Sequence, residues 1–177
     1  FIFSPMNSLP ANNPDWLVKK IIKMGGTISF YDYMNFVLND PINGYYGSGK
    51  AKLGVRGDFV TSSSLSDDFA FLVGRQIEEW LIQFKSIFLS NQKLAVIEFG
   101  AGNGSFMSGL IKYLLGSSKS FLKGVSFIII EPNKGMVEKQ KNKLEDFLNL
   151  GIDILWKGLE EIAVSYTHLR AHETIHY

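Results

Sequence analysis

The chain has 177 residues, of which 46% are hydrophobic and 20% are charged, and its formal net charge at pH 7 is +1. This length suits a globular polypeptide with one core, and the near-neutral charge gives no electrostatic case for binding nucleic acid. No apolar run approaches the roughly 20 residues of a membrane-spanning helix. The absence of cysteine excludes disulfides and thiolate chemistry.

Two helices are predicted near the N-terminus. Pro14 and Asp15 precede apolar residues at helical spacing that stop at a glycine pair, which predicts a helix with proline in its first turn. Ser29 starts the second predicted helix, since Asp32 follows three residues later as a weak capping box. This helix is expected to end before Pro41.

Residues 41–66 form a long segment that is rich in Gly and Ser and shows little periodicity. A loop of this length inside a compact protein is usually functional or mobile. Tyr45 offers a stacking surface, and Asp58, Thr61 and Ser62 offer a carboxylate and two hydroxyls. We interpret the segment as a loop that covers a ligand, and a solvated connector is the alternative.

A long helix is predicted to follow this loop. Ser66 is a good capping residue, and the acids after it favour the positive end of a helix that runs to about Phe88. Its predicted apolar stripe consists of Phe69, Leu72, Val73, Ile77, Trp80, Leu81 and Phe84.

Residues 94–115 combine an apolar run, a glycine cluster and apolar residues at helical spacing. This order predicts a strand, a tight turn and a helix. Gly100, Gly102 and Gly104 can adopt positive φ, and they lack the Cβ atoms that would keep a ligand away from the backbone. We therefore expect a ligand to lie on this turn.

The same order is repeated further along the chain. Residues 122–131 read as a second buried strand, and a helix is predicted from Pro132 to about Leu148. Residues 152–156 read as a third strand. Two successive βα units that lead into a strand predict a parallel sheet with right-handed crossovers.

Two acids at the strand ends help to choose between ligands. Glu98 would repel a pyrophosphate and suits a cationic ligand, whereas Glu131 can accept hydrogen bonds from both hydroxyls of a ribose. The dinucleotide fingerprint G-x-G-x-x-G would place its third glycine at position 105. This chain has Ser105 there, and its third glycine is Gly104. A NAD-binding domain is thus the disfavoured alternative, and a βαβ unit with surface carboxylates is another.

The glycine turn resembles the first motif of class I methyltransferases, which bind S-adenosylmethionine, a sulfonium that also carries an ammonium group. From about residue 26 to residue 161 the chain resembles the MidA-like family of these enzymes. The segments that carry the resemblance are Gly44-Tyr45-Tyr46, Gly57-Asp58-Phe59-Val60-Thr61-Ser62, Ile97-Glu98-Phe99-Gly100-Ala101-Gly102-Asn103-Gly104, Glu131-Pro132 with Gln140 and Leu144, and Trp156.

The resemblance implies an α/β fold with a Rossmann-like, doubly wound sheet after an N-terminal helical extension. Residues 1–90 would be the extension, including the loop 41–66, and residues 91–164 the first half of the cofactor domain. S-adenosylmethionine is the implied cofactor, and no catalytic or metal-binding residue is assigned. The residues expected to bind it are Glu98, Gly100, Gly102, Gly104, Glu131, Asp58, Thr61 and Ser62.

The resemblance also implies an activity, the N-methylation of arginine in an acceptor protein. Family members act on a respiratory complex I subunit during assembly, so the expected compartment is the cytoplasm in bacteria and the mitochondrial matrix in eukaryotes. A non-catalytic assembly factor that binds the cofactor is the alternative. Neither nucleic acid nor a membrane span is expected, and no oligomeric state is assigned.

The C-terminal residues are unlike the rest of the chain. His168, His172 and His176 are spaced so that one face of a helix could bind a metal. Residues 165–174 instead resemble a translated sequencing-adapter tail, so 165–177 is interpreted as non-native and is excluded from the fold. Because the family continues past the third strand and the chain begins at Phe1, we expect a fragment with a truncated sheet.

Overall fold

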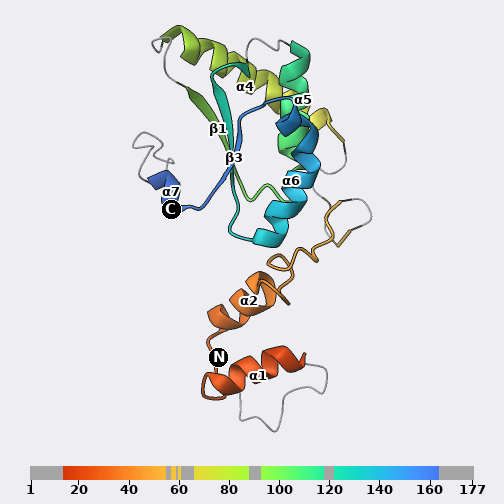
Figure 1. The fold of residues 1–177 in the computed structure, drawn as a ribbon, viewed down its shortest axis with the longest axis vertical. Coiled ribbons are helices and arrows are strands. Elements are labelled where there is room, and N and C mark those ends of the chain that lie inside the picture. The colour runs from red at the N-terminus through yellow and green to blue at the C-terminus, as the bar shows by residue number, and fades with distance from the viewer. Residues whose placement is uncertain are drawn as a thin grey trace, which may run out of the picture.

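The computed structural model describes residues 14–54, 57–58, 60, 66–87, 93–117 and 122–163. Figure 1 shows helices and strands that alternate through the second half of the chain. The elements are α1 (Asp15–Lys23), α2 (Phe30–Asn39), α4 (Asp68–Ile87), β1 (Leu94–Phe99), α5 (Ser105–Ser117), β2 (Val125–Ile130), α6 (Lys134–Asn149), β3 (Ile154–Lys157) and α7 (Glu160–Ala163). The segment interpreted as a tail, 165–177, lies outside the described residues.

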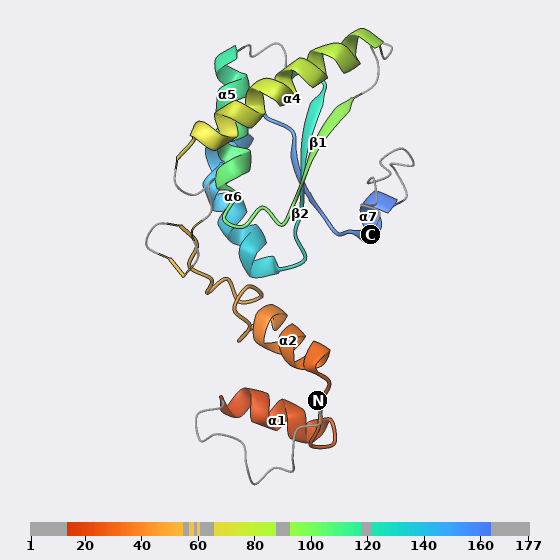
Figure 2. The ribbon, with the colours of Figure 1, turned by 180° about the vertical axis from the view of Figure 1, so that it is seen from behind.

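The three strands form one parallel sheet in the order β1-β2-β3. Leu94 pairs with Val125 in the first ladder, and Phe127 pairs with Ile154 in the second. Helix α5 connects β1 to β2, and α6 connects β2 to β3; both lie on one side of the sheet, with α7 on the other (Figures 1 and 2). The predicted α/β fold with two βα units and a parallel sheet is confirmed.

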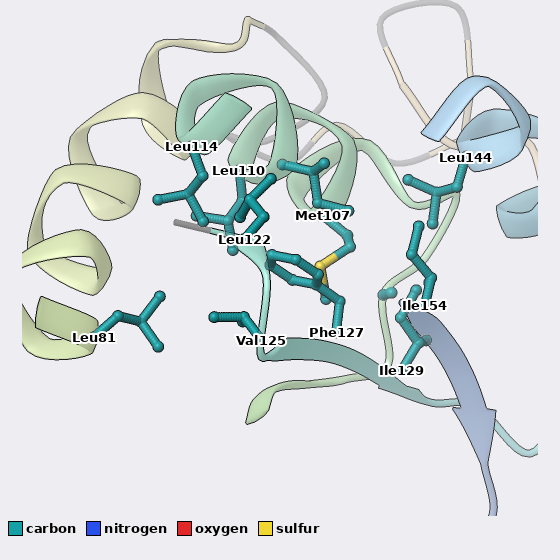
Figure 3. Close-up of a cluster of buried hydrophobic side chains, with 12 residues drawn as sticks. Leu81, Met107, Leu110, Leu114, Leu122, Val125, Phe127, Ile129, Leu144 and Ile154 are labelled. Carbon is teal, nitrogen blue, oxygen red and sulfur yellow. The ribbon is translucent and has the colours of Figure 1, made fainter. Parts of the chain in front are cut away.

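The hydrophobic core lies between the sheet and the helices α4, α5 and α6 (Figure 3). Alternate residues of β2 point to this side, and residues three or four apart on α5 meet them, as the two periodicities require. Burying each large apolar side chain contributes about 1.5–3 kcal/mol. The core side chains with 0% exposure are Met107, Leu110, Ile111, Leu114, Phe127, Ile129 and Leu144.

Helix α4 packs against α5 through small residues. A Cβ atom added at Gly109 would lie 2.6 Å from the Cβ of Ala70, so the two helices approach closely there. The predicted stripe of α4 is therefore partly wrong. Ala70 and Leu81 are buried, whereas Leu72 and Trp80 are 74% and 52% exposed. The side of α4 that contacts α5 is the one with small side chains. Large apolar residues such as Trp80 lie on another side, which is exposed.

This close contact makes a prediction about stability. Gly109→Ala should lower the free energy of unfolding by about 1–2 kcal/mol, because the added methyl group forces α4 away from α5. Gly116→Ala is the matched control on the same helix, since its new Cβ meets nothing within 4 Å. It should raise stability by about 0.5–1 kcal/mol. Urea denaturation measures both, and equal effects of the two substitutions would contradict the packing.

The N-terminal helices lie away from the sheet (Figures 1 and 2). The predicted cap of α2 is confirmed, since the Ser29 hydroxyl accepts from the backbone N–H of Asp32 at 3.0 Å. Helix α1 differs slightly, because Pro14 is its cap and makes no side-chain capping bond. Lys20 forms an ion pair of 2.9 Å with Asp40, which joins α1 to the end of α2. Among the described helices, none is long and apolar enough to cross a membrane.

Candidate functional site

The turn between β1 and α5 has the predicted backbone conformation. Gly100, Gly102 and Gly104 have φ values of 63°, 56° and 81°. The N–H of Gly100 donates to the carbonyl of Ile130 at 3.0 Å, so the ladder between β1 and β2 continues into the turn. The Asn103 side chain then accepts from the N–H of Ser105 at 3.1 Å, where α5 begins. The turn is therefore fixed at both of its ends.

The three glycines of the turn have different surroundings. A Cβ atom at Gly100 would meet nothing within 4 Å, so open space lies beside this residue. At Gly102 a Cβ would lie 3.2 Å from a methyl group of Leu53, and at Gly104 it would lie 3.5 Å from the backbone of Gln140. Gly100 is therefore the position at which a ligand can approach the backbone most closely. Gly104 instead packs against α6.

Glu98 lies in β1 directly before the turn. By strand alternation its side chain is on the same face as Leu94 and Val96, which pack on the core. Burial raises its pKa from 4.5 to about 7, and its Oε2 atom has no hydrogen-bond partner among the described residues. A charged carboxylate with a buried oxygen that lacks a partner is costly. A cationic group bound beside the turn would compensate this charge, so the site fits a cationic ligand.

Glu131 follows the last residue of β2 at the same edge of the sheet, because Phe99 and Ile130 are register partners. Its Oε1 atom accepts from the N–H of Asn133 at 3.0 Å, and its Oε2 atom accepts from the side-chain amide of Gln140 at 3.2 Å. Each oxygen can accept a second bond. The structure therefore places the two predicted acids at adjacent strand ends, at the edge of the sheet where the glycine turn begins.

The predicted covering loop contacts the turn through residues that the sequence did not single out. Leu53 lies against Gly102. The loop is also attached to α6, because Lys139 donates to the carbonyl of Ala51 at 2.5 Å. A Cβ added at Gly135 would lie 2.1 Å from the N atom of Gly49, so loop and helix approach each other with backbone in contact.

Asp58 is exposed and pairs within the loop. The Tyr45 hydroxyl donates to its carboxylate at 2.6 Å, and this hydrogen bond is the main cause of a raised pKa of Tyr45. Among the described residues, no hydrogen bond or ion pair joins the Asp58 side chain to the glycine turn. The other two loop residues predicted to bind the cofactor, Thr61 and Ser62, lie outside the described residues.

Two hollows in the described part of the chain are lined by neither Glu98 nor Glu131. The first, of about 430 Å³, is lined by Lys93, Gly124 and Asp153 among others, which precede the three strands and so lie at the opposite edge of the sheet. The second, of about 580 Å³, lies between the loop and α6. Its lining residues are Ala51, Lys52, Leu53, Gly57, Asn103, Lys139, Asn142 and Lys143. No metal-binding cluster of His, Cys, Asp or Glu occurs among the described residues.

Comparison with known proteins decides the family. A family model described as "Putative S-adenosyl-L-methionine-dependent methyltransferase" matches residues 72–176. The chain belongs to this family. The match includes the strand, glycine turn and acids described above.

Relatives and solved structures agree with this assignment. The chain is 30% identical to "Protein arginine methyltransferase NDUFAF7, mitochondrial" of Homo sapiens over 190 residues, which cover 93% of the chain and 41% of the relative. With the same-named protein of Bos taurus it shares 28% identity over 173 residues, 86% of the chain and 38% of the relative. The chain thus spans about 40% of the length of these relatives.

A solved structure shares the fold. A protein from Burkholderia thailandensis, crystallised with S-adenosyl-homocysteine bound, is 29% identical to the chain and superposes with a TM-score of 0.59. The match covers 85% of the chain and 40% of that protein. The fold of this methyltransferase family, preceded by N-terminal helices, is therefore shared with a structure that holds the demethylated cofactor.

Sequence reasoning did not find the contacts of Gln140. In the sequence this residue is named only among the segments that carry the family resemblance, whereas in the structure its amide bonds to Glu131, Gly102 and Trp156. A signal was available, because a glutamine in a stripe with Met136 must find hydrogen-bond partners when it is buried. The identity of those partners depends on the packing of α6 against the turn and β3.

Proposed function

We propose that the chain provides the cofactor-binding half of a methyltransferase that uses S-adenosylmethionine to methylate arginine in an acceptor protein. The observation that supports this most strongly is Glu98, a buried carboxylate whose Oε2 atom lacks a partner among the described residues, next to the open space beside Gly100. An anionic pyrophosphate there would face a carboxylate, and a cation would be attracted by it. A NAD-binding domain is therefore disfavoured again.

The residues at the turn have distinct roles in this proposal. Glu98 would attract the amino-acid end of the cofactor, Gly100 would allow its close approach, and Glu131 would accept from the ribose hydroxyls. Glu131 is well prepared for this role, since both of its oxygens already have one donor that holds them in place. Asp58, Thr61 and Ser62 remain proposed contacts from the covering loop.

When bound, S-adenosylmethionine supplies a methyl group on a positively charged sulfur. Transfer of a methyl group to a nitrogen is an in-line displacement, so the nucleophile, the methyl carbon and the leaving sulfur must lie on one line. The chain would contribute by holding the cofactor in this alignment. Methylated arginine keeps its charge but loses part of its hydrogen-bonding capacity. The modification would therefore change what the acceptor protein recognises.

The acceptor and the compartment are inferred from the relatives. Because these carry the name protein arginine methyltransferase and are mitochondrial, we infer an acceptor protein, with a respiratory complex I subunit as the candidate. The mitochondrial matrix would be the compartment in a eukaryote, and the cytoplasm in a bacterium.

Two measurements on the full-length protein test the proposal. Titration calorimetry should show S-adenosylmethionine binding that NAD does not displace. Transfer of a labelled methyl group to arginine in a complex I subunit should then be detected by mass spectrometry. Binding without transfer to any acceptor would favour a non-catalytic assembly factor, and displacement by NAD would overturn the cofactor assignment.

A further inference from the structure

Gln140 is a polar residue at a completely buried position. Its side chain is 0% exposed and lies on the same face of α6 as Met136 and Leu144, which are also buried. An amide in such a place is costly unless its donors and acceptor are all paired. The surroundings of Gln140 therefore reveal which groups it serves.

Three hydrogen bonds give every N–H and the oxygen of the amide a partner. Its Nε2 atom donates to the carbonyl of Gly102 at 2.9 Å and to Oε2 of Glu131 at 3.2 Å. Its Oε1 atom accepts from the indole N–H of Trp156 at 2.9 Å. One side chain thus joins the glycine turn, the acid after β2 and a residue of β3.

The chemistry of these partners fixes the orientation of the amide. An indole N–H can only donate, so the amide oxygen must face Trp156 and the amide nitrogen must face the other two groups. A flipped amide would set its oxygen against the Glu131 carboxylate and the Gly102 carbonyl, which are both acceptors. Trp156 therefore holds Gln140 in the orientation that supports the turn and the acid.

The bond to Gln140 is the contact that restrains Glu131 from outside its own segment. The carboxylate also accepts from the backbone N–H of Asn133, which is only two residues away and therefore moves together with Glu131. Gln140 is on the second turn of α6 and is held by Gly102 and Trp156 as well. It can therefore set the rotation of the carboxylate plane relative to the glycine turn.

We propose that Gln140 is a positioning residue for the ribose of the cofactor, and that Trp156 acts through it. Gln140 directs one carboxylate oxygen of Glu131 and holds the Gly102 carbonyl, so that the acid and the turn keep a fixed separation. This inference rests on the proposed function, because it assumes that Glu131 binds the ribose hydroxyls.

The test compares two ligands on the full-length protein. S-adenosyl-homocysteine and its 2′-deoxyribose analogue are titrated calorimetrically against the unaltered protein, Gln140→Met and Leu144→Met. The unaltered protein should prefer the ribose form by about tenfold or more, since the acceptor is charged. Gln140→Met should bind S-adenosyl-homocysteine about tenfold more weakly and should lose most of that preference. Leu144→Met, a volume-conserving change at a buried position one turn away, should keep it.

Each result has a definite meaning. If Gln140→Met weakens both ligands by the same factor, the residue only supports the fold and the inference is overturned. If the unaltered protein shows no preference for the ribose form, the proposed contact of Glu131 with the ribose fails instead. A failure of the positioning role is seen in Gln140→Met, which would keep the preference for the ribose form. A failure of the Glu131 contact is seen in the unaltered protein, which would lack this preference.

A second variant is decisive if thermal melting shows that Gln140→Met is unfolded. Trp156→Phe keeps an aromatic ring at this partly buried position, but it removes the N–H that orients the amide together with part of the indole ring. Its preference for the ribose form should fall several-fold, and a single cooperative melting transition should show that the variant is folded. An unchanged preference in this variant would contradict the positioning role.

Discussion

Replacing Glu131 with alanine is expected to weaken the binding of S-adenosylmethionine by about 1–3 kcal/mol, which is roughly a 5- to 150-fold increase in Kd. The reason is that a carboxylate at the end of β2 would lose its hydrogen bonds to the ribose hydroxyls. Isothermal titration calorimetry on the full-length protein measures the change directly. Thermal melting without ligand reports any loss of stability separately.

Glu138→Ala is the matched control for this experiment. Glu138 is also on the segment that follows β2, but it is exposed and pairs with Lys141 at 3.5 Å on the surface of α6. Its removal should leave the affinity unchanged, since exposed ion pairs contribute little. If Glu131→Ala binds as tightly as the control does, Glu131 does not hold the ribose.

Raising the pH toward 7 is expected to strengthen S-adenosylmethionine binding by about tenfold per pH unit. Burial raises the pKa of Glu98 from 4.5 to about 7, so the ligand-free protein carries a proton there below pH 7. A cationic ligand prefers the ionised form, and binding therefore releases this proton. Calorimetry in two buffers of different ionisation enthalpy measures the release, and the affinity should level off above pH 7.

The same group should lower the stability of the ligand-free protein as the pH rises. Between pH 4.5 and about 7 the folded state keeps the proton on Glu98 and the unfolded state does not, so the free energy of unfolding falls with pH. The loss amounts to about 3 kcal/mol above pH 7.

Glu98→Gln should remove both effects of pH. The variant would be more stable than the unaltered protein above pH 7, because no buried charge forms. It would bind S-adenosylmethionine more weakly, since the attraction to the cation is lost. An affinity that is independent of pH between 4.5 and 7 in the unaltered protein would show that Glu98 does not face the ligand.

Local patterns in the sequence predict a large part of this fold. The change of period at Gly100 and the capping pair Ser29 and Asp32 depend on residues close together in the chain, and the structure agrees with both. The parallel order of the strands follows from the alternation of strand and helix. The placement of Glu98 and Glu131 at one edge follows from that order.

Contacts between distant segments are the part that the sequence did not predict. The helical spacing in α4 predicts that apolar residues such as Trp80 are buried. In the structure α5 instead packs against α4 where the small residues Ala70 and Gly109 meet. The position of Leu53 against Gly102 depends on how the loop lies over α6. Such contacts depend on packing geometry, which periodicity does not encode.

The proposed function requires a cationic cofactor bound between Glu98 and Glu131 on the glycine turn. The most direct measurement is a crystal structure of the full-length protein grown with S-adenosyl-homocysteine. We expect the ribose hydroxyls within hydrogen-bonding distance of Glu131, the amino-acid portion of the ligand against Gly100, and its ammonium group toward Glu98. A ligand seated instead in the hollow lined by Lys52, Lys139 and Lys143 would contradict it.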